Sequence, residues 1–135
     1  MQRSALACAT ATCTLLVLDA LWLFAGGSYT MFTRMASGMT TVRPWEGWQT
    51  ALFTCAAYAL LSLAICVLAL PAKDPAVAAG KGALLGLTVY GVFDLTNLVL
   101  FGRRYGLELA AADVCWGTFV VGTSSLAGAL AGSAA

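Results

Sequence analysis

Four long runs of apolar residues, separated by short polar breaks, dominate the hydrophobic pattern of this chain. They extend over about residues 5–25, 48–70, 82–101 and 107–130. Each run has close to the roughly 20 residues that an α-helix needs to cross a bilayer. Because backbone groups exposed to lipid must be satisfied within their own segment, the pattern predicts four transmembrane helices and an all-α membrane protein.

The breaks between the runs predict how the helices are connected. The third and fourth runs are only a few residues apart, around Gly102, Arg103 and Arg104, which predicts a tight antiparallel hairpin. A loop over residues 71–81 joins the second run to the third. We therefore expect an up-down four-helix bundle, a single domain over residues 1–135, with both termini on the same side of the membrane. Lys and Arg divide almost evenly between the two sets of loops, so the orientation stays open.

The break after the first run, residues 27–47, is the longest. Trp45, together with Trp48 just beyond the break, is suited to a membrane interface. Residues 28–32 predict a short interfacial segment. The break also carries charged residues, Arg34, Arg43 and Glu46.

Composition agrees with a bilayer environment and narrows the function classes. Of the 135 residues, 61% are hydrophobic and 10% are charged, whereas a soluble domain carries roughly 25% charged residues. A net charge of +1 argues against a nucleic-acid partner. The absence of histidine excludes histidine ligands and histidine-based nucleophilic catalysis. The five cysteines form no CxxC motif, and we interpret them as small apolar residues.

Small residues recur at four-residue spacing within the predicted spans. Such a spacing places them on one helix face, where they allow two helix backbones to approach closely. We interpret these positions as contacts of a compact bundle or of a docking face; they are Ala51, Cys55 and Ala59, Gly82 and Gly86, and Gly128 and Gly132.

Three aspartates, Asp19, Asp94 and Asp113, lie inside the predicted spans. A carboxylate at the centre of a bilayer costs at least about 2.5 kcal/mol, so these residues require a compensating role. Each lies roughly 10 Å from the span end that faces the first or third loop. Alternating topology then puts all three in the same half of the bilayer. The sequence thus predicts one carboxylate layer.

Other polar and aromatic residues extend this layer. Tyr90 and Asn97 lie four residues before and three residues after Asp94, on the same helix face. Trp22 and Trp116 each follow another of the aspartates by three residues, and an indole N–H can donate to a carboxylate. We interpret the set as a buried polar site that binds a ligand or a proton: Asp19, Asp94, Asn97, Asp113, Tyr90, Trp22 and Trp116.

The site has several interpretations. Desolvation and mutual repulsion favour neutral carboxyl groups, so we expect at least one aspartate to hold a proton near neutral pH unless a cation reaches the layer. Hydrogen-bonded aspartates that lock helices together, a proton- or cation-linked transport site, and a headgroup or small-ligand site all use the same residues. The spacing specifies no metal site and no catalytic residues.

Three segments resemble the motifs of a known family. Residues 18–23, LDALWL, resemble its LDAIWLG motif; residues 90–98, YGVFDLTNL, resemble YGTYDLTNL; and residues 113–118, DVCWGT, resemble DIAWGT. The chain is thus identified as a member of a family of small predicted membrane proteins, domain of unknown function 2177. The resemblance implies four helices and places each aspartate in a family motif. It implies no activity, because the family has none assigned.

We expect a membrane protein that is not an enzyme and acts as a structural or accessory subunit of a larger membrane protein complex. The alternative is a small oligomeric proton- or cation-linked transporter that uses the intramembrane aspartates. Expected partners are membrane lipids and other membrane subunits. No cofactor of its own is evident, although lipid or pigment held by partners would fit. Which membrane is unknown, and an organellar inner membrane or a thylakoid membrane stays open as an option.

Overall fold

The computed structural model describes residues 2–25 and 47–134, and this part of the chain is almost entirely helical and contains no strand. Its helices are α1 (Gln2–Phe24), α3 (Gly47–Ala64) with the π-helical turn η1 (Ile65–Ala69), α4 (Pro75–Phe101), the 3-10 turn η2 (Gly102–Arg104), and α5 (Leu107–Ala134). Four of them are long and apolar enough to cross a membrane. The predicted all-α class with four spans is confirmed.

Most of the longest break lies outside the described residues. This concerns the expected interfacial segment at residues 28–32, Trp45, and the charged residues Arg34, Arg43 and Glu46.

The helix α4 begins earlier than predicted. Asp74 caps it, because a side-chain oxygen accepts a hydrogen bond from the backbone N–H of Ala76 at 2.7 Å, and Pro75 occupies the first turn. Both are standard helix-start signals. The predicted loop over residues 71–81 is therefore wrong in its second half. Lys81, the last residue of the predicted loop, lies within α4.

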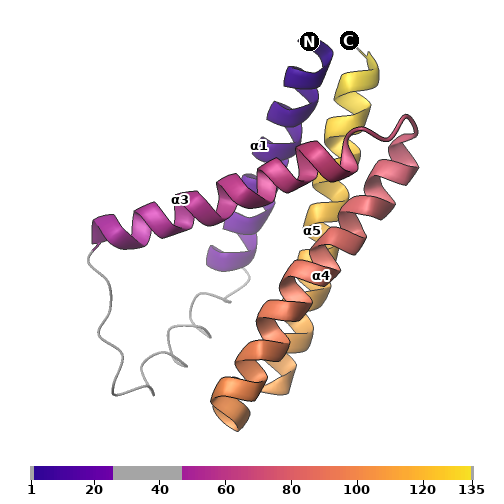
Figure 1. Ribbon diagram of the computed structural model, residues 1–135. Helices are drawn as coiled ribbons and strands as arrows, with labels where there is room; N and C mark the ends of the chain where they lie inside the picture. Colours follow the sequence, from indigo (N-terminus) through magenta and orange to yellow (C-terminus); the bar gives the residue numbers. More distant parts are fainter. Residues whose placement is uncertain (1, 26–46, 135) are drawn as a thin grey trace.

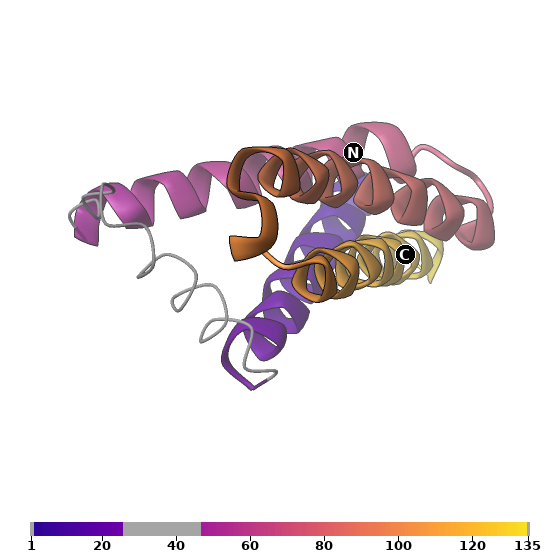
Figure 2. The same ribbon diagram turned by 90° about the horizontal axis from the view of Figure 1, so that it is seen from below.

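Three of the helices pack together and the fourth leans away. α4 and α5 lie antiparallel along most of their lengths, and α1 packs against α5 (Figure 1). α3 diverges from this group toward its Gly47 end, which both views show (Figures 1 and 2). None of the 18 residues of α3 is buried. The beginning of α1 and the end of α5 lie at the same end of the protein (Figure 1); the membrane side they occupy stays a prediction.

Close helix contacts use the predicted small residues. A Cβ atom added at Gly86 would meet backbone atoms of Gly117, and one added at Gly82 would meet Val121 O at 2.7 Å. A Cβ atom at Gly128 would meet Ala7 O on α1 at 2.7 Å. These glycines let α5 approach both of its neighbours, as expected of small residues at helix interfaces.

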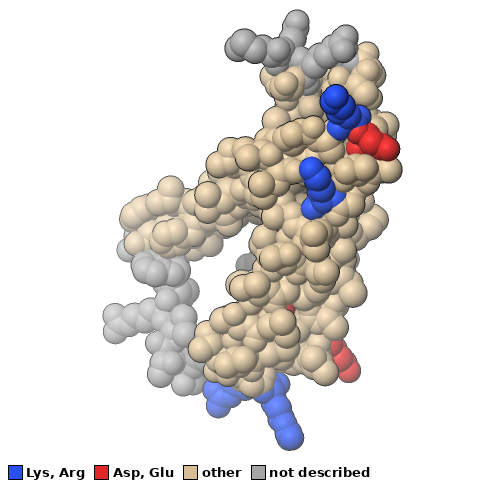
Figure 3. All heavy atoms as spheres, turned by 45° about the vertical axis from the view of Figure 1, so that its right-hand side comes forward, with Lys and Arg blue, Asp and Glu red and all other residues tan. Residues whose placement is uncertain are grey.

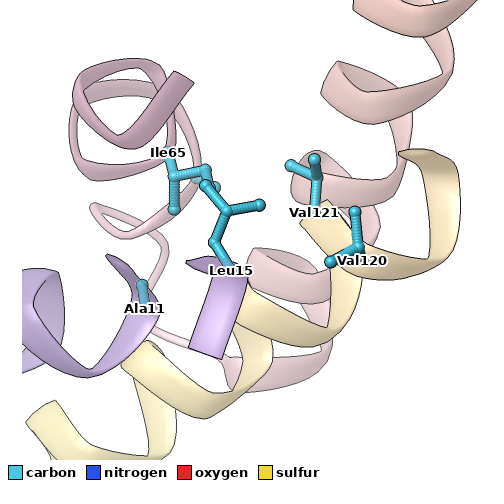
Figure 4. Close-up of a cluster of buried hydrophobic side chains, with 6 residues drawn as sticks. Ala11, Leu15, Ile65, Val120 and Val121 are labelled. Carbon is cyan, nitrogen blue, oxygen red and sulfur yellow. The ribbon is translucent and has the colours of Figure 1, made fainter. Parts of the chain in front are cut away.

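The core lies where α1, η1 and α5 meet. Its buried side chains include Leu15, Ile65, Val120 and Val121, which face one another across the three elements (Figure 4). The π-helical turn η1 supplies Ile65 and Ala69, and its widened ring is closed by the hydrogen bond from Leu70 N to Ile65 O at 3.1 Å. α3 is thus anchored to the core through the turn that follows it.

A tight turn joins α4 to α5, as predicted. Gly102 and Gly106 have φ angles of 57° and 85°, a backbone region that favours glycine. Charged side chains gather at the two ends of the described helices, while the middle of the visible face is almost free of them (Figure 3). Arg103 and Arg104 lie in the turn, and Glu108 in the first turn of α5. This distribution suits a helix group that crosses a membrane.

Candidate functional site: a buried carboxylate layer

Asp19 on α1 accepts hydrogen bonds at both of its carboxylate oxygens. The indole N–H of Trp116 on α5 donates to Oδ1 at 2.8 Å, and the Tyr58 hydroxyl on α3 donates to Oδ2. The residue is only 7% exposed. Both donors come from other helices, so Asp19 connects α1 to α5 and to α3.

The two tryptophans bond the aspartates reciprocally across α1 and α5. Trp22 on α1 donates to Oδ1 of Asp113 on α5 at 3.3 Å, while Trp116 on α5 donates to Asp19 on α1. The indole rings stack, with centroids 4.9 Å apart and planes at 10°. Each Asp-x-x-Trp segment therefore supplies an acceptor and a donor to the other helix. The sequence predicted the donors, and the structure shows that each indole serves the aspartate of the opposite helix.

Asp94 on α4 forms a separate part of the layer. Its Oδ1 accepts a hydrogen bond from the hydroxyl of Tyr105, which lies in the turn between α4 and α5. The residue is 0% exposed, and its Oδ2 has no hydrogen-bond partner in the described part of the chain. Among the described residues the Tyr105 hydroxyl alone stabilises this carboxyl group, and burying a charge with so little compensation is costly.

Tyr105 and Asn97 complete the surroundings of Asp94. Burial raises the pKa of the Tyr105 hydroxyl, the hydrogen bond to Asp94 raises it further, and the nearby Asn97 side chain opposes the change. Tyr105 is 3% exposed and packs with Leu109 and Ala110. The hydroxyl therefore stays protonated and donates to Asp94.

The carboxyl group of Asp113 interacts electrostatically with both of the other carboxyl groups, those of Asp94 and Asp19. Asp113 is 6% exposed and accepts one hydrogen bond, from Trp22. The structure thus brings the three aspartates into one electrostatically connected group, on α1, α4 and α5.

A cavity opens beside this group. It has a volume of about 410 Å³ and is bordered by Asp19, Asp113, Tyr58 and Tyr90 on its polar side and by apolar side chains of α1, α3 and α4 elsewhere. Tyr90 is half-buried, and its ring lies against Gly117, where an added Cβ would collide with it. A second cavity of about 530 Å³ lies on the other flank of α3 and also touches Tyr58.

Two tyrosines of the site were missed in the sequence analysis. Tyr58 and Tyr105 donate to Asp19 and Asp94, yet neither was assigned to the layer. Tyr58 lies in the middle of the second apolar run, where a hydroxyl group needs a partner because lipid offers none. This requirement was the available signal for Tyr58. Tyr105 lies in the connecting turn, and its role follows only from the way the turn folds back over α4.

The described residues offer no group of three or more His, Cys, Asp or Glu side chains that could hold a metal ion. The groups that donate to the carboxylates are tyrosine hydroxyls and tryptophan indoles. The indole N–H groups of Trp22 and Trp116 donate hydrogen bonds and offer no lone pair to a metal ion. The arrangement is suited to binding protons or hydrogen-bond donors.

Comparison with known proteins adds one match. A family described as predicted membrane protein (DUF2177) matches residues 4–130. No curated protein and no solved structure matches the chain. The matched region contains all four candidate spans almost completely.

Proposed function

This chain belongs to the DUF2177 family of predicted membrane proteins, and we propose that it is a non-enzymatic accessory subunit of a larger membrane protein complex. The observation that carries the proposal is α3, a helix of 18 residues none of which is buried. In a bundle that functioned alone, a fourth helix would bury at least one face against its neighbours. A partner subunit would bury the apolar surface that α3 leaves exposed.

The surface of α3 supports docking of another helix. Ala51, Cys55 and Ala59 lie on one face and are exposed, and Cys55 and Ala59 also border the cavity of about 530 Å³ between α3 and α1. Small residues at this spacing permit close approach of a second helix backbone, and the same spacing does so between α4 and α5. Leu60 and Leu63, with 68% and 59% of their surface exposed, add apolar area. The expected partners are other membrane subunits, in addition to lipids.

The non-enzymatic part of the proposal draws on the residues available. The sequence contains no histidine, and the carboxyl groups of the layer are engaged by tyrosine and tryptophan donors. Groups held in this way position helices, and among the described residues their hydrogen-bond partners are tyrosines and tryptophans, with no serine, cysteine or lysine nucleophile.

The test is purification of the tagged chain from its native membrane in mild detergent. We expect it to migrate as part of a discrete large assembly. A photo-cross-linking residue at Leu60 should join it to one subunit of that assembly, whereas the same residue at Leu84, a matched position with 64% exposure on α4, should not. Migration only as a free small protein would contradict the proposal.

A second candidate function rests on Asp94. A fully buried carboxyl group with one oxygen unpartnered in the described structure is suited to take up and release a proton, and proton-linked transporters place such groups within their spans. Four helices enclose little space, so this function would require an oligomer.

Proton flux into liposomes that contain the purified chain tests this candidate. Asp94→Asn should abolish the flux, whereas Asp74→Asn should not, because Asp74 is exposed at the start of α4 and asparagine also caps helices well. Normal flux through Asp94→Asn would exclude the carboxyl group as the coupling site.

A further inference from the structure

The cavity beside the carboxylate layer has the features of a ligand site. Its volume of about 410 Å³ lies within the range of roughly 300–1,000 Å³ that is typical of small-molecule sites. Most of its border is apolar, and its polar groups converge from different helices: Asp19 on α1, Tyr58 on α3 and Asp113 on α5. We propose that this cavity binds a lipid-soluble amine, with its ammonium group on Asp113 and its apolar chain between α3 and α4.

The position of the open acceptor favours Asp113 over Asp19. Asp19 already accepts hydrogen bonds at both oxygens, from Trp116 and Tyr58. Asp113 accepts one bond, at Oδ1 from Trp22, and no described residue donates a hydrogen bond to its Oδ2. Asp113 is only 6% exposed and borders the cavity. Asp113 therefore combines a buried side chain, an acceptor oxygen unpartnered in the described structure and a position at the border of the cavity.

Charge selects an ammonium group. The residues that border the cavity include two aspartates and no lysine or arginine. The indole of Trp22 is a neutral donor, so it leaves the charge of an ionised Asp113 uncompensated. An ammonium ion supplies the opposite charge and up to three hydrogen-bond donors, and the ring of Tyr90 can attract it further. A phosphate or carboxylate head would be repelled.

The apolar rim shows from where the ligand enters. Val89 and Phe93 on α4 border the cavity and are 43% and 54% exposed. In a membrane these side chains contact lipid tails, so the cavity opens sideways toward the hydrocarbon. A molecule that enters by this route must be lipid-soluble. Ala57 and Leu61 of α3 form the opposite part of the same border, so the apolar chain would lie between α3 and α4.

The test uses the purified chain in phosphatidylcholine nanodiscs and three probes of equal chain length: octadecylamine, octadecanol and octadecanoic acid. After subtraction of binding to empty nanodiscs, the amine should bind saturably, and at least about tenfold more tightly than the alcohol or the acid, as expected for a charge-assisted hydrogen bond. Equal affinity for the three probes would overturn the proposal.

Substitutions locate the site. Asp113→Asn should weaken amine binding by about tenfold or more and leave the alcohol unaffected. Ala57→Trp should fill the cavity and remove amine binding, whereas Ala56→Trp should not, because Ala57 borders the cavity and its exposed neighbour Ala56 does not. Thermal unfolding and gel filtration show whether each variant is folded. If Asp113→Asn is unfolded, the two tryptophan variants decide: wild-type amine binding by Ala57→Trp would overturn the proposal.

The inference does not depend on the proposed role as a subunit. Ala57→Trp should leave co-migration with the large assembly and cross-linking from Leu60 unchanged. Loss of amine binding and loss of the assembly are therefore separate outcomes.

Discussion

The α4–α5 pair and α3 are built from similar residues and behave differently. Both regions are apolar and contain small residues at four-residue spacing. In the pair, Gly82 and Gly86 contact the backbone and small side chains of α5. On α3, Ala51 and Cys55 occupy the same kind of spacing and remain exposed.

The difference shows what holds helices together in a bilayer. Lipid tails are as apolar as leucine, so burial of apolar area alone gives little drive for association. α4 and α5 add close backbone contact, a short connection and the Tyr105–Asp94 hydrogen bond. α3 is tied by its π-helical turn and by the bond from Tyr58 to Asp19. Specific contacts, more than hydropathy, therefore decide which helices form the compact group.

The largest expected effect is on the α4–α5 contact. Gly86→Ala should destabilise the protein by about 1–3 kcal/mol, because the new Cβ would collide with backbone atoms that cannot move independently. Gly91→Ala on the same helix is the matched control. No atom lies within 4 Å of its added Cβ, so it should be neutral or stabilising, by up to about 1 kcal/mol. Unfolding in detergent followed by circular dichroism measures both; equal effects would remove close approach as the explanation.

Tyr105→Phe should have the next largest effect. It removes the donor to Asp94, whose other oxygen already lacks a partner in the described structure, and should cost about 1–2 kcal/mol. The same unfolding assay measures it.

The effect of Tyr105→Phe should depend on pH. Because the pKa of Tyr105 is raised in the folded protein, above the value of about 10 for a free phenol, its contribution is complete below about pH 10 and is lost as the pH rises further. The difference between wild type and variant should therefore shrink above about pH 10. A constant difference across this range would contradict the shift.

Tyr58→Phe tests the corresponding bond of α3. Asp19 keeps its second donor, Trp116, so the loss should be smaller, about 0.6 kcal/mol, an average value for side-chain hydrogen bonds within membranes. The variant should also increase the distance between spin labels on α3 and α5, measured by electron paramagnetic resonance. An unchanged distance would show that η1 alone sets the position of α3.

Leu60→Ala should have the smallest effect. Leu60 is 68% exposed on α3, and substitutions of exposed residues usually change the stability by no more than about 0.5 kcal/mol. In the purified chain its unfolding should match wild type, while co-migration with the proposed complex should weaken. A loss of stability in the isolated chain would mean that α3 packs against the core in solution.

Sequence reasoning predicted the elements better than their packing. Hydropathy identified the four spans, because length and apolar composition are what a bilayer requires. The predicted start of α4 is too late, although Asp74 and Pro75 carry the signals of a helix start, because the apolar run on which the prediction rests begins only at about residue 82. The lean of α3 could not be predicted, since its composition suits contact with lipid and contact with protein equally.

The site was predicted in part for similar reasons. Spacing and span depth indicated that the aspartates share a layer, and Trp22 and Trp116 were expected donors. Each of these tryptophans bonds the aspartate of the other helix. This pairing depends on which faces of α1 and α5 meet, and the two helices are far apart in the sequence. Tyr105 contributes through the fold of a turn, which helix periodicity does not describe.

The reciprocal tryptophan–aspartate bonds have a consequence for how the chain is made. Asp19 lies in α1, and its partner Trp116 on α5 follows 97 residues later. At about 5–20 residues per second, the ribosome needs roughly 5–20 seconds to supply that partner. Throughout this interval the Asp19 carboxyl group lacks the indole donor from α5. α1 therefore completes its hydrogen bonds only after α5 has been synthesised.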